Sequence, residues 1–111
     1  RYIADELCGF TFTVNGFQTL FELIGRLQKK ENLEKVPQNL PMLMVSGAED
    51  PVGDYGRGVT KACDSLKKAG VKNITVKLYE NDRHELLNEE DGERAMEDIY
   101  QWIRKEIPAF V

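Results

Sequence analysis

The sequence of 111 residues predicts an α/β domain in which two parallel strands are joined by a crossover helix. A continuous apolar run over residues 41–47 is typical of a strand covered on both faces. Apolar residues at helical spacing follow over 58–69, up to the stop at Gly70. Residues 74–79 then alternate between apolar and polar, which is typical of a strand near a sheet edge. The strand–helix–strand order makes the two strands parallel.

The composition excludes several classes of protein. With 41% hydrophobic and 31% charged residues, the chain is too apolar for disorder over most of its length, and we expect one domain or part of one. The net charge of −4 and the absence of a basic stripe argue against nucleic acid as a partner. No apolar run approaches the roughly 18 residues of a membrane span, and no export leader is visible. Cys8 and Cys63 lack disulfide-scaffold spacing, so we expect reduced thiols in a cytoplasmic protein.

The N-terminal part predicts a helix that follows an unpatterned segment. Residues 1–13 show no clear period, and Asn15 is a suitable helix cap. Residues 31–36 predict a short helical turn that Pro37 closes. Between the cap and this turn, five apolar side chains recur at helical spacing, and their aromatic members are expected in the core: Phe17, Leu20, Phe21, Ile24 and Leu27.

The C-terminal part predicts a loop over 80–85 and a final helix over 91–107. Acidic residues gather near the start of this helix, and Arg104 and Lys105 lie near its end, as the helix dipole favours. Its apolar stripe comprises Met96, Ile99, Ile103 and Ile107, with Trp102 beside it.

The predicted sheet is incomplete. Two parallel strands cannot bury both of their faces, yet residues 41–47 require cover on two sides and at least one further strand. We expect the missing strands in residues outside this chain or in another copy of it. The second possibility predicts a homo-oligomer joined through the exposed strand edge.

Two loops at the carboxyl ends of the predicted strands carry the candidate catalytic residues. Asp50 follows the first strand, and His84, the only histidine, follows the second. A carboxylate that orients an imidazole creates the general base that a hydroxyl nucleophile requires. Asp54 is the second candidate for the acid. The alternatives are structural, because Asp50 before Pro51 also suits a turn and a lone histidine in a polar loop is commonly a surface residue.

No metal or cofactor site is expected. The cysteines have no metal-ligand spacing, and no pattern of His or Cys joins the acidic residues after His84. These residues are more typical of a solvated helix start: Glu85, Glu89, Glu90, Asp91 and Glu93.

Three segments resemble a known superfamily. Residues 41–59, PMLMVSGAEDPVGDYGRGV, resemble the strand and acid loop of the α/β-hydrolases, in the branch of lysophospholipase-like enzymes, monoacylglycerol lipases and serine aminopeptidases. Residues 76–89, VKLYENDRHELLNE, resemble the histidine segment of the same branch, and residues 8–12 with the following helix resemble the exit from its cap region. The resemblance implies that Asp50 is the triad acid and His84 the general base.

The same resemblance implies that the catalytic machinery is incomplete in this chain. The nucleophile of the superfamily precedes the acid, in a Gly-x-Ser-x-Gly turn. The two serines here, Ser46 and Ser65, lack those glycines. Since the chain also begins at Arg1 and not at methionine, we expect a C-terminal fragment, with 1–15 as the end of the cap and 16–111 as the last strands and helices of the core.

The implied parent is a serine ester hydrolase acting on a lipid or small-molecule ester. Its nucleophile and oxyanion hole lie outside this chain, so the chain alone is expected to be inactive. The alternative is a stand-alone, non-catalytic α/β module for interaction or assembly.

Overall fold

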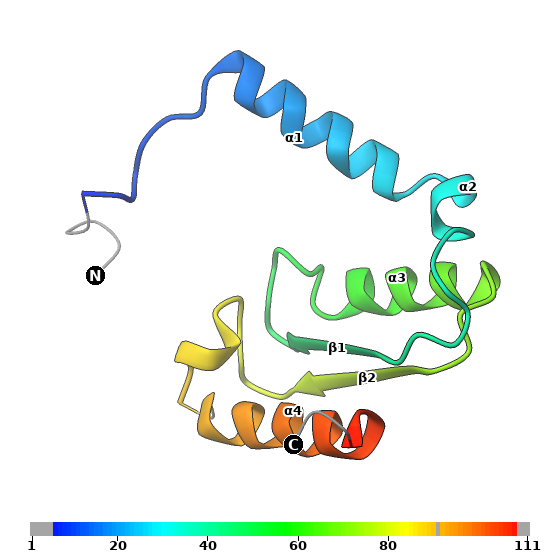
Figure 1. Ribbon diagram of the computed structural model, residues 1–111. Coiled ribbons are helices and arrows are strands. Elements are labelled where there is room, and N and C mark those ends of the chain that lie inside the picture. The colour runs from blue at the N-terminus through cyan, green and yellow to red at the C-terminus, as the bar shows by residue number, and fades with distance from the viewer. Residues whose placement is uncertain (1–5, 91, 109–111) are drawn as a thin grey trace.

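The computed structural model describes residues 6–90 and 92–108 and has the predicted α/β architecture (Figure 1). Along the chain the elements are α1 (Val14–Leu27), α2 (Lys30–Leu33), β1 (Met42–Gly47), α3 (Arg57–Lys68), β2 (Ile74–Tyr79), the 3₁₀ helix η2 (Leu86–Asn88) and α4 (Gly92–Glu106).

The two strands form a parallel sheet, as the strand–helix–strand order predicts. Met42 pairs with Ile74 at one end of the register, and Gly47 pairs with Tyr79 at the other. The strand β1 is less buried than its apolar sequence predicts, because its side chains are half-buried and only Gly47 is fully enclosed. In the described part of the chain its one partner is β2, so its second edge is unpaired.

The helices α3 and α4 lie on opposite faces of this sheet (Figure 1). On the α4 face a small core joins Tyr79, Leu86 and Ala95, with Val45 packed against it. On the α3 face the side chain of Leu78 lies close to Gly56, the N-cap of α3. The neighbouring residues Leu78 and Tyr79 of β2 thus face two different layers, as strand geometry requires.

One predicted boundary differs from the structure, and one short element was not predicted. The cap of α1 is Thr13 and not Asn15, because Thr13 is extended and its Oγ1 accepts the N–H of Gly16 at 3.0 Å. The expected start of the last helix, Asp91, lies outside the described residues. The 3₁₀ helix η2 was not predicted, since three residues are too few to show a hydrophobic period.

The expectation that the α1 aromatics lie in a core was wrong. Phe17 and Phe21 are exposed, Phe21 by 65%, and no residue of α1 is buried. Figure 1 shows α1 standing apart from the sheet and its two covering helices. The helical period predicted the helix itself correctly, but no other described element covers its apolar face. Of the two cysteines, Cys63 is buried and Cys8 is half-buried, and both are free thiols.

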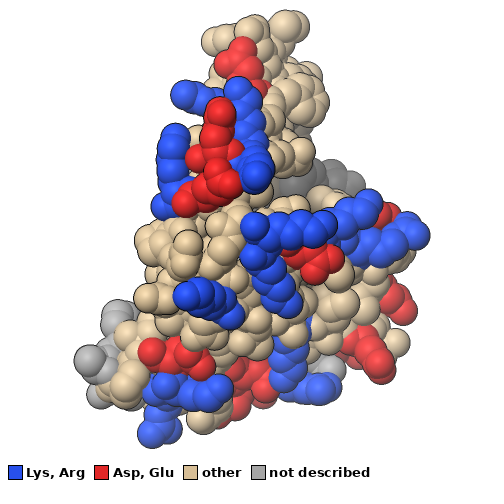
Figure 2. Space-filling model, turned by 90° about the vertical axis from the view of Figure 1, so that its right-hand side faces the viewer, with Lys and Arg blue, Asp and Glu red and all other residues tan. Residues whose placement is uncertain are grey.

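The surface carries mixed charge. Figure 2 shows acidic and basic side chains interspersed over one face of the molecule, so this face has no field of a single sign. Among the described residues, no helix combines the length and the apolar character that crossing a bilayer demands.

Candidate active site

The two candidate loops leave the sheet at the same edge, because β1 and β2 run parallel. One loop follows Gly47 and carries Asp50, and the other follows Tyr79 and carries His84. Two backbone hydrogen bonds join them: Ala48 N–H donates to the Tyr79 carbonyl at 2.8 Å, and Glu49 N–H donates to the Asp82 carbonyl at 2.9 Å. The loops therefore lie against each other before either side chain is considered.

A glycine at the end of β1 makes this contact possible. A Cβ atom on Gly47 would fall inside van der Waals distance of the carbonyl oxygens of Asp82 and Arg83. Both atoms belong to backbone, which cannot swing aside as a long side chain can. The absence of a side chain at position 47 thus sets how closely the histidine loop approaches β1.

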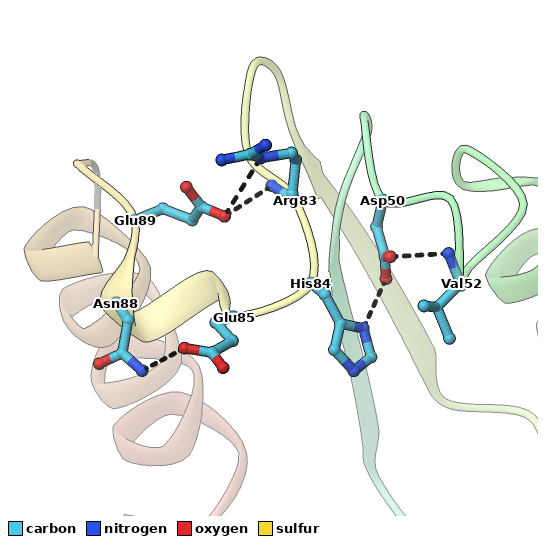
Figure 3. Close-up of polar contacts among 7 residues, drawn as sticks. All are labelled: Asp50, Val52, Arg83, His84, Glu85, Asn88 and Glu89. Carbon is cyan, nitrogen blue, oxygen red and sulfur yellow. Dashed lines mark hydrogen bonds and ion pairs between the residues drawn. The ribbon is translucent and has the colours of Figure 1, made fainter. Parts of the chain in front are cut away.

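Asp50 and His84 are in direct contact, as predicted. His84 Nδ1 lies 3.0 Å from Asp50 Oδ2, and the N–H of Val52 donates to Asp50 Oδ1 at 2.8 Å (Figure 3). Asp50 is 5% exposed, whereas the His84 side chain is 64% exposed. The second candidate acid, Asp54, is held elsewhere, because its Oδ1 accepts from Arg57 Nη2 at 2.6 Å.

Hydrogen bonds and burial act on the pKa of Asp50. The hydrogen bond from His84 lowers the pKa of Asp50, burial of the carboxyl raises it, and the Val52 N–H lowers it, with a net shift downward. Asp50 is therefore an ionised acceptor, and an ionised carboxylate can only accept hydrogen bonds. The shared proton must belong to His84 Nδ1. In the neutral imidazole this leaves a lone pair on Nε2, the nitrogen that points away from Asp50 in Figure 3.

The loop of Asp50 is held by its own backbone. Tyr55 N–H donates to the Asp50 carbonyl at 2.9 Å, and Gly58 N–H donates to the Gly53 carbonyl at 3.0 Å. Asp54 and Tyr55 both have left-handed backbone angles, with φ of 51° and 54°. The chain therefore turns tightly from Asp50 into α3, which keeps the carboxylate at the end of the strand.

Asp50 and His84 line an open pocket at this edge of the sheet, together with Val45, Ser46, Glu85, Leu86, Leu87, Asn88 and Ile99. Neither serine of the chain occupies a nucleophile turn. Ser46 Oγ donates to the Gly47 carbonyl at 3.3 Å within β1, and Ser65 Oγ donates to the Lys61 carbonyl at 2.9 Å within α3. The described residues also contain no cluster of His, Cys, Asp or Glu able to hold a metal ion.

Sequence reasoning missed Glu89, which the acidic pattern placed on a solvated helix start. Its Oε1 accepts the N–H of Arg83 at 3.3 Å, directly before His84 (Figure 3). No periodicity marks such a contact, because it depends on how η2 turns the chain back toward the loop. The sequence marks Gly47 as the end of a strand but gives no sign of its contact with the histidine loop.

Comparison with known proteins agrees with this architecture. The family described as "Serine aminopeptidase, S33" matches residues 1–91. A solved structure, that of a highly thermostable carboxyl esterase from Bacillus coagulans in complex with glycerol, is 28% identical with a TM-score of 0.77. The match covers 95% of this chain but 34% of the esterase, so the chain spans about a third of that enzyme. No curated protein matches significantly.

The family match extends over most of the chain and includes both β1 with its acid loop and β2 with its histidine loop. The structural match adds that these elements superpose on part of an esterase. The chain therefore belongs to the serine aminopeptidase, S33 family of hydrolases and forms part of an α/β-hydrolase fold.

Proposed function

We propose that this chain is the C-terminal part of a serine ester hydrolase of the lysophospholipase-like or monoacylglycerol lipase-like type, with Asp50 as triad acid and His84 as general base. The observation that carries the proposal is the 3.0 Å contact between His84 Nδ1 and Asp50 Oδ2 at the carboxyl ends of two parallel strands. Residues 1–15 would be the end of the cap and 16–111 the last part of the core.

The arrangement suits acyl transfer. Nε2 of His84 would take the proton of a serine hydroxyl supplied from outside this chain, and the serine oxygen would form a bond to the ester carbonyl carbon. The protonated imidazole would then give that proton to the leaving alcohol as its bond to the acyl carbon breaks. Asp50 would hold the Nδ1–H tautomer and stabilise the imidazolium. Water, activated by the same base, would release the acid. No cofactor takes part in these steps.

The substrate class follows from the same proposal. An ester of a lipid or a small molecule would lie over the pocket that Asp50 and His84 line. We place the protein in the cytoplasm, in keeping with the free thiols of Cys8 and Cys63. We also infer that the chain self-associates through the unpaired edge of β1 when no further strand is present.

The test is hydrolysis of p-nitrophenyl butyrate by the gene product that contains these residues. His84→Ala abolishes turnover, and Asp50→Asn lowers kcat by about 10⁴-fold, the size expected when a triad acid becomes an amide. Asp54→Asn is the matched control and leaves kcat unchanged, because Asp54 is bound to Arg57. Equal activity of Asp50→Asn and Asp54→Asn would overturn the assignment.

The 111-residue chain by itself should show no esterase activity, because it supplies a base with no nucleophile or oxyanion hole to serve. Turnover by the chain that survives His84→Ala would contradict the fragment interpretation. Turnover that His84→Ala abolishes would instead reveal a nucleophile within this chain. A gene product without Gly-x-Ser-x-Gly would favour the stand-alone module.

A further inference from the structure

The loop that presents His84 is held on a second side by a carboxylate. Glu89 follows η2, and its Oε1 accepts the backbone N–H of Arg83 at 3.3 Å (Figure 3). The same oxygen lies 3.9 Å from Arg83 Nε. The Glu89 side chain is 22% exposed and that of Arg83 is 70% exposed, so the carboxylate is the more enclosed partner.

From this geometry we propose that Glu89 is a positioning residue for His84, which holds the backbone one residue before the histidine and so keeps the imidazole over Asp50. The significance for catalysis rests on the proposed function. The structural claim does not, because it concerns where the ring lies and not what it does.

Packing alone cannot hold the ring. The His84 side chain is 64% exposed, so few neighbours restrict it, and its position depends on the loop backbone and on one hydrogen bond to Asp50. The loop is attached to β1 at Asp82, whose carbonyl accepts from Glu49 N–H. Between Asp82 and His84 along the chain, the hydrogen bond from the Arg83 N–H to Glu89 is the next contact that holds the loop backbone. A charged acceptor makes this bond stronger than a neutral one.

Neighbouring glutamates do not share this role. Glu85 accepts from Asn88 Nδ2 at 3.0 Å within η2. Glu90 is exposed and lines the same polar pocket as Glu89 and Arg83, but in the described part of the chain it makes no hydrogen bond to the loop. Glu90 is therefore a matched control, with the same charge and a neighbouring position.

The experiment compares Glu89→Ala, Glu89→Gln and Glu90→Ala in the full 111-residue chain by NMR. The two readouts are the hydrogen exchange of the Arg83 amide and the Nδ1–H resonance of the His84 ring. Glu89→Ala should speed Arg83 exchange about tenfold, the factor that loss of a hydrogen bond to a charged group implies, and should broaden or remove the Nδ1–H signal. Glu89→Gln keeps a carbonyl acceptor and should retain that signal. Glu90→Ala should match the wild type.

Unchanged exchange and ring signals in a folded Glu89→Ala chain would overturn the proposal, and so would a Glu89→Gln chain that behaves like Glu89→Ala. If Glu89→Ala fails to fold, Glu89→Asp replaces it, because a side chain shorter by one methylene keeps the charge but withdraws the acceptor. Neither readout involves ester turnover. If the gene product has no esterase activity but the predicted NMR changes occur, the proposed function alone is refuted. If the gene product is active but the NMR changes do not occur, the positioning role alone is refuted.

Discussion

At the scale of single residues, Asp50 and His84 have opposite environments although they share one hydrogen bond. The carboxylate is enclosed by its own loop, while the imidazole lies largely in solvent. The burial of Asp50 limits its rotation and keeps Oδ2 directed at Nδ1, whereas the exposure of His84 leaves Nε2 accessible. This division of roles suits a base that must meet a group from another part of a protein.

The lowered pKa of Asp50 makes stability depend on pH in a definite direction. A carboxyl group whose pKa is lower in the folded state stabilises the fold above its unfolded value, here 3.8, and loses that contribution as the pH falls through its folded value. We therefore expect Asp50→Asn to flatten the decline in free energy of unfolding below about pH 4. Urea titrations at neutral and acid pH measure the free energy of unfolding of the wild type and of Asp50→Asn. An equal decline in the two proteins would contradict this prediction.

A second residue-scale prediction concerns Tyr79. Its hydroxyl donates to Asp98 Oδ2 at 3.0 Å, and burial, followed by this hydrogen bond and the Asp98 charge, raises the pKa of Tyr79 to about 12. Stability from this phenol is complete below the ordinary value of 10.0 and is lost as the pH rises toward 12. Tyr79→Phe should cost about 1 kcal/mol at neutral pH and remove this alkaline loss. Urea unfolding at neutral and alkaline pH measures both effects, and an equal alkaline loss of stability in the wild type and in Tyr79→Phe would contradict the prediction.

At the scale of elements, the sequence predicts the β1–α3–β2 unit well. The spacing of apolar residues and the proline and glycine residues that bound the elements agree there. An apolar run between Pro41 and Gly47 and a helical stripe that stops at Gly70 each have one simple interpretation. The short η2 and the cap at Thr13 were beyond such reasoning. The first is too brief for a period, and the second depends on a backbone angle that Thr13 and Asn15 could both have supplied.

The candidate site shows the same division. The proximity of Asp50 and His84 was predictable from topology, since parallel strands bring their terminal loops together. The contacts of Gly47 with the Asp82 and Arg83 carbonyls, and of Glu89 with Arg83, were not predictable. Both depend on the path of an irregular loop, and no repeating pattern in the sequence encodes such a path.

The contact at Gly47 gives a prediction about the β1 end. Gly47→Ala should destabilise the chain by about 1–3 kcal/mol, because the new methyl group must displace the backbone at Asp82 and Arg83. It should also separate His84 from Asp50. Gly25→Ala is the control, since a Cβ there meets nothing within 4 Å and alanine suits a helix better. Thermal melting followed at the sheet should shift to lower temperature in Gly47→Ala and stay unchanged in Gly25→Ala, and an equal shift in both variants would argue against the steric role of Gly47.

At the scale of the whole molecule, the described sheet has two strands, so β1 pairs with β2 alone. The side chains of β1 are half-buried, and its second edge is unpaired among the described residues. The match covers 34% of an esterase, so most of that enzyme has no counterpart in this chain. At the unpaired edge of β1, apolar side chains and unpaired backbone groups lie side by side.

We therefore predict that the 111-residue chain self-associates at micromolar concentration, with a two-fold dimer through β1 as the expected form. Burial of apolar surface at about 25 cal/mol per Å² would drive the association. Light scattering measures the mass directly. A clean monomer with a cooperative melt would contradict this prediction and favour the stand-alone module.

The uncovered apolar face of α1 affects the order in which parts of the chain unfold. A helix of 14 residues with no buried side chain and two internal glycines, Gly16 and Gly25, depends on its own cap and hydrogen bonds, and such helices are marginal in water. Its unwinding need not disturb the sheet, so the chain has two cooperative units of unequal strength. On warming, α1 would fray first and offer its backbone to a protease. Asp50 and His84 would stay joined on the sturdier unit that remains.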